Sequence, residues 1–299
     1  MICLKRMINR ILSCFGMTII RNKLLEPSVV VDEEIGTIFG IQYRDMRNGV
    51  VVTVPMEKGR ALPIFSYRKL GSHPFVLSAR AAVTKSTHRE EVVLDVLSNY
   101  YAYVSPCNVN EVLGLSSSRP ELNELPGWAV VMPWDEEDIF CWKEKIVSSV
   151  LSENSRYRKN TGVDYGWAWA GPTSDIKCGI EARRLLGVLD SIVKCGYRRH
   201  NGPDGDILAN VLARSPDEWV WQSVGAQHRA AVLAALGNEY VPIRVVKVIR
   251  REDVSSWPNV VRGLYTEREA LKIFDDIFEE NYCHVTSDWE RFISENGDP

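Results

Sequence analysis

The sequence lacks any sign of a cysteine-based scaffold. Its 299 residues include seven cysteines, an odd number, scattered along the chain without a Cys-x-x-Cys pair. This distribution argues against a disulfide framework and against a zinc cluster. We therefore expect reduced thiols and a cytoplasmic protein.

The chain also lacks a strong net charge, internal repeats and low-complexity segments. Its formal net charge at pH 7 is −3, whereas a domain that binds a nucleic-acid duplex usually carries a clear basic excess. Nucleic acid is therefore not an expected partner. With 45% hydrophobic and 25% charged residues, the composition is that of a globular protein that can bury a substantial core.

Acidic residues are absent from the first 23 positions, which contain five basic residues. Apolar residues between Leu4 and Phe15 recur at helical spacing, and basic and polar residues occupy the other face, as in a basic amphipathic helix. Asn9 and Arg10 interrupt this apolar run, which is far shorter than the roughly 20 residues of a membrane span. We expect residues 1–23 to form a helix that either packs on the protein or binds an anionic membrane surface at the cytoplasmic face.

The next part of the chain mixes strand and helix patterns. The β-branched run at 50–54 favours a strand, whereas 90–103 and 136–152 have helical spacing. The apolar segment 125–134 contains two prolines and predicts a buried strand. We expect a β-rich, mixed α+β N-terminal domain over residues 25–152, with no role that these patterns reveal.

Residues 153–175 interleave aromatic and basic side chains with glycines. They contain Tyr157, Tyr165, Trp167 and Trp169, together with Arg156, Arg158 and Lys159. Such a segment can stack on a sugar or a base while its cations meet phosphate, or its rings can simply pack the loop onto the domain. We predict a linker or lid here, with both roles open.

The stretch Gly225-Ala-Gln-His-Arg229 has the strongest features of a binding site. It joins an apolar strand pattern at 219–224 to an Ala/Leu-rich helix. Unpaired N–H groups and the positive end of the helix dipole favour an anion at such a turn, and His228 and Arg229 add donors and charge. Two alternatives stay open, namely a core histidine bonded to backbone and an arginine paired with a carboxylate.

The pattern from 175 to 250 resembles the ParB/sulfiredoxin-like superfamily. The resemblance is carried by Leu189-Asp-Ser-Ile192, Gly196-Tyr197, Gly225-x-x-His-Arg229, Leu236-Gly237 and Val241-Pro-Ile-Arg-Val245. It implies a ParB/sulfiredoxin-like domain over 176–299 with a C-terminal helical extension, and an α+β protein overall. Members of this superfamily handle nucleotides, so the resemblance implies a nucleotide as partner.

The turn departs from each branch of that superfamily. Sulfiredoxin has its reactive cysteine directly before the His-Arg pair, where this chain has Gln227, so sulfinic-acid reduction is not expected. The partition proteins have a Gly-Glu-Arg-Arg turn, and the free-serine kinases have an Asp where this chain has Gly225. The tail after Arg250 is short and acidic, which does not suit a DNA-binding domain. The feature of the superfamily that the resemblance still implies for this chain is a phosphate-binding site.

The same resemblance places phosphate-binding side chains on the preceding helix. In its register, Ser191 takes the position of a threonine and Arg184 that of a lysine, seven residues apart and therefore on one helix face. The predicted site for ATP, ADP or CTP consists of Arg184, Ser191, Gly225, Gln227, His228 and Arg229.

Phosphoryl transfer at this site would require a metal ion and a general base. Asp204 and Asp206 flank a glycine and could ligate Mg²⁺, although such residues often only stabilise the turn. We predict Glu181 as the base, with His228 as the second catalytic residue. An exposed helix glutamate is the alternative for Glu181, and we expect Lys177 to be solvated.

Two classes of function follow from this site. The first is a nucleotide-dependent kinase or phosphotransferase whose hydroxyl acceptor is a small molecule, a glycan or a lipid-linked sugar at the cytoplasmic face of the membrane. The second is a ParB-like nucleotide switch that recruits nucleic acid or protein without chemistry of its own.

Overall fold

The computed structural model describes residues 38–44, 49–62, 65–85, 87–115, 120–158, 161–199, 205–281 and 284–296. The predicted amphipathic helix at 1–23 and the predicted metal ligand Asp204 lie outside these residues.

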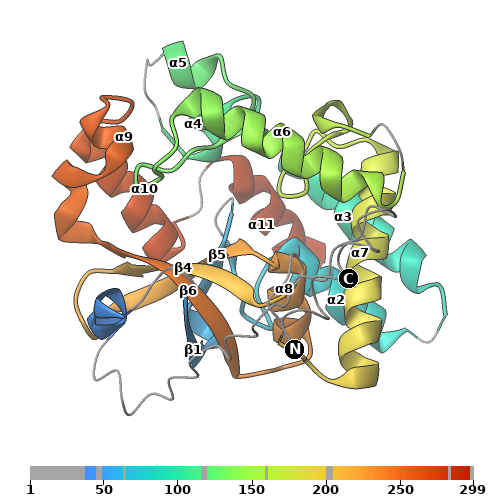
Figure 1. Cartoon of the computed structure of the whole chain (residues 1–299). Coiled ribbons are helices and arrows are strands. Elements are labelled where there is room, and N and C mark those ends of the chain that lie inside the picture. The colour runs from blue at the N-terminus through green and yellow to red at the C-terminus, as the bar shows by residue number, and fades with distance from the viewer. Residues whose placement is uncertain are drawn as a thin grey trace, which may run out of the picture.

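One mixed sheet of six strands, in the order β1-β6-β4-β5-β2-β3, forms the centre of the fold (Figure 1). The strands are β1 (Val50–Pro55), β2 (Gly59–Ala61), β3 (Phe65–Ser66), β4 (Ile207–Ala213), β5 (Trp219–Gly225) and β6 (Tyr240–Arg250). The β4–β6 and β2–β5 pairs are parallel, and the other neighbours are antiparallel. The protein is therefore of the α+β class, as predicted.

The sheet crosses the predicted boundary between an N-terminal and a C-terminal domain. β1 pairs with β6, so that Val52 faces Ile243, and β2 pairs with β5, so that Gly59 faces Trp221. These side chains, apart from that of Gly59, belong to one continuous apolar core. The apolar side chains of the first third and the last third of the chain thus depend on each other for their burial.

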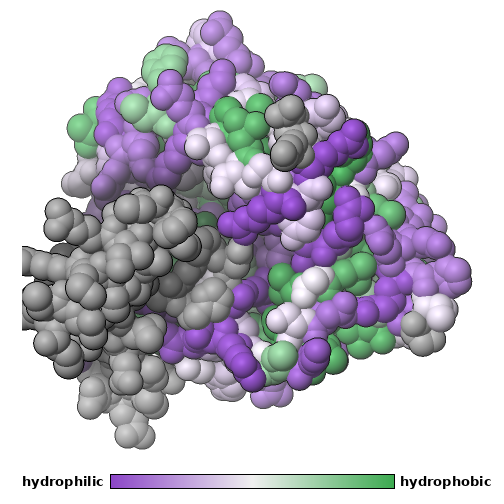
Figure 2. Space-filling view, turned by 45° about the vertical axis from the view of Figure 1, so that its right-hand side comes forward, coloured by the Kyte–Doolittle hydropathy of each residue, from purple (hydrophilic) through white to green (hydrophobic). Residues whose placement is uncertain are grey.

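Four helices pack together beside the sheet and enclose this core. They are α2 (Pro74–Thr84), α3 (Arg89–Tyr103), α7 (Asp175–Cys195) and α8 (Gln227–Ala235), and α11 (His284–Asn296) adds Trp289 to the same core. In the view turned toward this helical side, hydrophilic residues are interspersed with small groups of hydrophobic ones (Figure 2). Among the described residues, no helix has both the length and the apolar character needed to cross a membrane.

A second apolar cluster joins the sheet to the remaining helices. Its residues come mainly from the elements around α4 (Val109–Val112), η4 (Gly127–Ala129), η6 (Arg251–Ser256), α9 (Pro258–Val261) and α10 (Glu267–Glu279). The other elements are η1 (Ile38–Tyr43), η3 (Met56–Lys58), α5 (Pro120–Asn123), α6 (Ile139–Ser155) and η5 (Val163–Tyr165). α10 begins with the capping box of Thr266 and Glu269 that its sequence predicts.

The buried strand predicted at 125–134 is wrong. This segment forms the short helix η4 and then an extended stretch that joins no sheet. Its carbonyl oxygens are satisfied by side chains instead, because Tyr265 donates to Val131 at 2.6 Å and Asn259 donates to Met132 at 2.9 Å. Prolines cannot donate to a sheet ladder, so this apolar segment is buried without strand partners.

Candidate functional site

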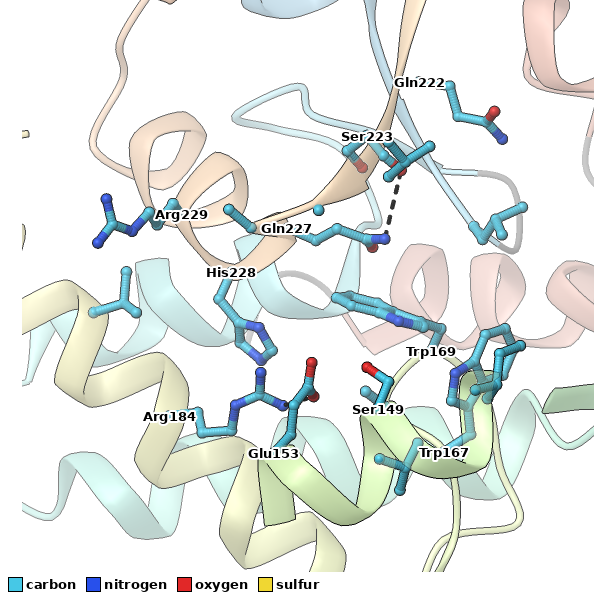
Figure 3. A pocket seen from close by; sticks show the side chains of 18 of the residues that line it. Ser149, Glu153, Trp167, Trp169, Arg184, Gln222, Ser223, Gln227, His228 and Arg229 are labelled. Atoms are coloured by element: carbon cyan, nitrogen blue, oxygen red, sulfur yellow. Dashed lines mark hydrogen bonds and ion pairs between the residues drawn. The ribbon is translucent and has the colours of Figure 1, made fainter. Parts of the chain in front are cut away.

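A cavity of about 830 Å³ opens between the β5–α8 turn, α7 and α6. Figure 3 shows α8 and β5 on one side of it and α6 and α7 on the other. All six predicted nucleotide-binding residues line this cavity: Arg184, Ser191, Gly225, Gln227, His228 and Arg229. Residues predicted across 46 positions of sequence therefore line a single cavity. The volume of this cavity is in the usual range for ligand pockets, about 300 to 1,000 Å³.

The β5–α8 turn presents open donors to the cavity. Ala226, the N-cap of α8, adopts a left-handed conformation with φ 54° and supplies no side-chain cap. The N–H of Arg229 returns to the carbonyl of Ala226 at 3.0 Å, while no acceptor within the described chain takes the N–H groups of Gln227 and His228. A left-handed alanine is strained, and it leaves the helix N-terminus open toward an anion.

Gly225 does not provide the positive φ of this turn, which belongs to Ala226. A Cβ atom at Gly225 would lie 3.1 Å from Cδ1 of Leu208, which is tighter than most real contacts. The glycine therefore allows close approach of β4, where the pairing with β5 shifts register between Leu208 and Ala209.

Glu181 lies beneath the cavity at the centre of a buried charge cluster. Its side chain is fully buried, and its carboxylate accepts from Nζ of Lys177 at 2.6 Å and from Arg184 at 3.0 Å. Nε2 of His228 lies 3.0 Å from its Oε2. Burial alone would raise the pKa of Glu181, but Arg184, His228 and Lys177 outweigh it and hold this pKa well below the ordinary range.

This environment does not suit the general-base role predicted for Glu181. A carboxylate with a strongly lowered pKa accepts a proton poorly, and its oxygens already have three partners. It is also not the exposed glutamate of the alternative interpretation. The prediction that Lys177 is solvated is wrong, because its ammonium is buried between Glu181 and the Oδ1 of Asn154, at 2.7 Å from the latter.

His228 is buried at the N-terminus of α8 and lines the cavity. Its ring packs edge-on against Phe75, with centroids 4.7 Å apart, and lies 5.7 Å from the ring of Trp169. Burial, together with the charge of Arg184, lowers the pKa of His228 below its ordinary value despite the opposing effect of Glu181. We therefore treat the imidazole as neutral, with Nε2 close to Glu181 but outside hydrogen-bond geometry, and with no hydrogen bond to Nδ1 among the described residues.

Arg184 and Ser191 both face the cavity, as their spacing on one helix predicts. The guanidinium of Arg184 bridges Glu181 and, across the cavity wall, Glu153 of α6 at 3.0 Å (Figure 3). Ser191 is exposed. A phosphate that binds Arg184 would therefore share this guanidinium with the carboxylate of Glu153 or displace that carboxylate.

Arg229 points away from His228 (Figure 3). Its guanidinium donates to the carbonyl oxygens of Arg198 at 3.3 Å and Gly205 at 3.1 Å, and it lies over the ring of Tyr197. Arg198 is exposed at the rim of the same cavity. Two cations thus border the open end of α8.

The predicted magnesium ligand Asp206 is not part of this site. Its carboxylate is buried and accepts from Nε of Arg199 at 3.0 Å and from Nε of Arg244 at 3.1 Å. It does not line the cavity. Two guanidinium groups occupy its oxygens, so Asp206 stabilises the start of β4 instead of holding a metal. Over the part of the chain that the structure describes, no three His, Cys, Asp or Glu side chains gather as a metal site.

Sequence reasoning missed the polar side chains on the sheet and on the segment before α6. Asn210 of β4 and Gln222 of β5 are directly paired, are 7% and 2% exposed, and line the cavity. Asp135 lines it as well, and burial raises the pKa of this carboxyl to about 6. Amides inside two strands of mainly apolar residues were the available signal for Asn210 and Gln222.

The predicted lid residues pack onto the core, which is one of their two predicted roles, while stacking on a ligand stays a prediction. Trp167 and Trp169 pack against the main core, and they also line the cavity together with Tyr157. Tyr100 and Tyr101 donate hydrogen bonds to the carbonyls of Trp169 and Ala168, which holds this segment in place.

No protein-family model, no curated protein and no solved structure matches this chain.

Proposed function

We propose that this protein binds a nucleotide in the cavity, with the phosphates at the N-terminus of α8. One observation carries the proposal. The N–H groups of Gln227 and His228 have no acceptor in the described chain, and both residues line a cavity that Arg184, Arg198 and Arg229 also border. Backbone donors at a helix N-terminus, together with guanidinium groups, are the chemistry by which proteins hold phosphate.

The order of the elements supports this reading. Helix α7, strand β5, helix α8 and strand β6 follow one another in the order of the motifs that carry the resemblance to the ParB/sulfiredoxin-like superfamily, with β4 as a further strand before β5. The half-buried indoles of Trp167 and Trp169 add the flat apolar surface that a base or a sugar requires.

Thermal and calorimetric titration with ATP, ADP, CTP and GTP, each with and without Mg²⁺, tests the proposal. A bound nucleotide at about 100 times its Kd stabilises the fold by about 2.7 kcal/mol. Arg229→Gln should weaken binding about tenfold, because a hydrogen bond to a charged group contributes about 1.5 to 3 kcal/mol. Arg268→Gln, at an exposed position on α10 outside the cavity, is the matched control. The proposal fails if no nucleotide stabilises the wild type.

Phosphotransfer is the second candidate, and the buried pair of Glu181 and His228 favours it. In this step the acceptor hydroxyl oxygen bonds to the terminal phosphorus, and the bond from that phosphorus to its bridging oxygen breaks. The nucleoside diphosphate leaves, and the hydroxyl proton moves to Nδ1 of His228. Glu181 is then the positioning residue that keeps the imidazole in the Nε2–H form.

Magnesium would enter this reaction with the nucleotide phosphates and neutralise their charge. Glu153 and Asp135 are the carboxylates that line the cavity, so they replace Asp206 as its candidate protein ligands.

Release of orthophosphate with water as the acceptor tests the enzymatic candidate. His228→Gln should retain nucleotide binding and lose turnover by about 100-fold or more, because general base catalysis contributes 10² to 10⁴. Wild-type activity should be constant above neutral pH and should fall in acid, since the lowered pKa keeps His228 neutral until then. Unchanged turnover in His228→Gln would leave a nucleotide switch as the function. The acceptor at a membrane face stays a prediction that depends on residues 1–23.

A further inference from the structure

The wall of the cavity formed by β4 and β5 carries two buried carboxamides. Asn210 and Gln222 are cross-strand partners, which puts both side chains on the same face of the sheet, with Cβ atoms about 5 Å apart. Gln222 is 2% exposed, and its Oε1 has no hydrogen-bond partner in the described structure. A buried amide without a partner costs free energy, about 1 to 3 kcal/mol. Such a group in a cavity wall indicates a ligand that donates the missing hydrogen bond.

The surroundings of this amide pair differ from those of the phosphate end. Leu62, Val130 and Met132 add apolar side chains to the lining of the cavity. In Figure 3, Gln222 and Trp167 lie toward one side of the cavity and Arg229 lies at the opposite side, with His228 and Trp169 between them. The cavity therefore has a cationic end at α8 and a second end that amides and aromatic rings line.

The separation of the two ends matches a nucleotide. Gln222 and Gly225 are three residues apart on β5, which corresponds to about 10 Å along an extended strand. A ribose and its phosphates bridge such a gap between a base and a helix N-terminus.

We propose that Asn210 and Gln222 form a subsite that recognises the hydrogen-bonding edge of a nucleobase, with the indole of Trp167 or Trp169 as its stacking surface. This inference rests on the proposed nucleotide function, and it names the residues that would recognise the base of the nucleotide. Each carboxamide offers one acceptor oxygen and two N–H donors, which suits the alternating donors and acceptors along the edge of a base. Indole faces stack on any base.

Calorimetry with ATP, GTP, CTP, UTP, inorganic tripolyphosphate and glucose 1-phosphate separates the two ends of the site. In the wild type, at least one nucleotide should bind tenfold or more tightly than tripolyphosphate, because only the nucleotide reaches the amide pair. Gln222→Met and Asn210→Leu keep side-chain size and remove the amides, so they should reduce nucleotide affinity about tenfold. Their affinity for tripolyphosphate should stay unchanged, whereas Arg229→Gln should weaken both kinds of ligand.

The stability of the free protein gives a second measurement. Gln222→Met should be at least as resistant to urea as the wild type, because it removes a buried polar atom that has no partner. A structural role would instead make this variant less stable, which would count against the subsite.

Three results would overturn the inference. They are equal binding of tripolyphosphate and every nucleotide by the wild type, unchanged nucleotide affinity in both amide variants, and tighter binding of glucose 1-phosphate than of any nucleotide. The first and second leave the phosphate end of the proposed function intact. Absence of binding by all of these ligands would remove the proposed function itself.

Discussion

At the scale of single residues, this protein buries several ionisable side chains that its sequence places on ordinary helix faces. Lys177 and Glu181 are one turn apart on α7, a spacing that often gives an exposed pair. Here both side chains are at most 1% exposed, and His228 completes the group from α8. Removing one member of such a cluster leaves an uncompensated buried charge, so Glu181→Gln is a poor test of catalysis.

His73 provides a test of a buried titratable group at this scale. It is the N-cap of α2, its Nδ1 accepts from the N–H of Phe75 at 3.2 Å, and burial lowers its pKa to about 3. The unfolded chain takes up a proton near pH 6.5 and the folded chain does not, so stability is lost as the pH falls below 6.5.

Between pH 7.5 and pH 5, the wild type should therefore lose about 2 kcal/mol more unfolding free energy than His73→Asn. Asparagine keeps a capping acceptor and does not titrate. Urea unfolding at both pH values measures the difference. Parallel losses in the two proteins would show that His73 is protonated in the folded state.

At the scale of elements, α9 and the segment that precedes α10 hold the extended stretch before α6. Asn259 is 1% exposed, and its Nδ2 donates to the carbonyls of Met132 at 2.9 Å and Asp135 at 3.1 Å. The same stretch carries Asp135 and leads into α6, which forms one wall of the cavity. A side-chain clamp thus replaces the strand pairing that the apolar pattern predicts.

Asn259→Ala should reduce the free energy of unfolding by about 3 kcal/mol, because it removes two buried hydrogen bonds and leaves the carbonyl of Asp135 without its side-chain donor. The exposed Asn281→Ala, just after α10, is the matched control and should change stability by less than about 0.5 kcal/mol. Urea titration of both variants checks this. If the two variants lose equal stability, solvent or neighbouring groups satisfy the carbonyls of Met132 and Asp135.

At the scale of the whole molecule, the sheet joins segments separated by about 190 residues of sequence. β1 lies at one edge and depends on β6, and β2 depends on β5, so each half of the chain covers apolar surface of the other. The cavity is shared in the same way, with walls from α6, α7 and the β5–α8 turn. Folding of the site should therefore be inseparable from folding of the entire protein.

The full chain should accordingly unfold in one cooperative transition, and the fragments 1–160 and 161–299 should show none when expressed separately. Calorimetry and near-ultraviolet circular dichroism of the three proteins measure this. A cooperative transition in the isolated fragment 161–299 would contradict this expectation and would support the predicted C-terminal domain at 176–299.

Local features of the site could be read from the sequence because short-range physics decides them. The apolar and alanine patterns place β5 and α8 on either side of the turn, and the seven-residue spacing puts Arg184 and Ser191 on one face of α7. A capping box predicts the start of α10 because its hydrogen bonds lie within four residues. These features depend on residues that are close together in the sequence.

The sequence by itself determined α7, β5, α8 and α10, and the open helix N-terminus with its His-Arg pair. Tertiary structure alone decided that Glu181 is a buried counter-ion, that Asp206 pairs with arginines, and that Asn210 and Gln222 face a cavity. The reason is physical, since burial and ion pairing depend on groups that meet only when distant segments pack, and these groups set each pKa and each free donor.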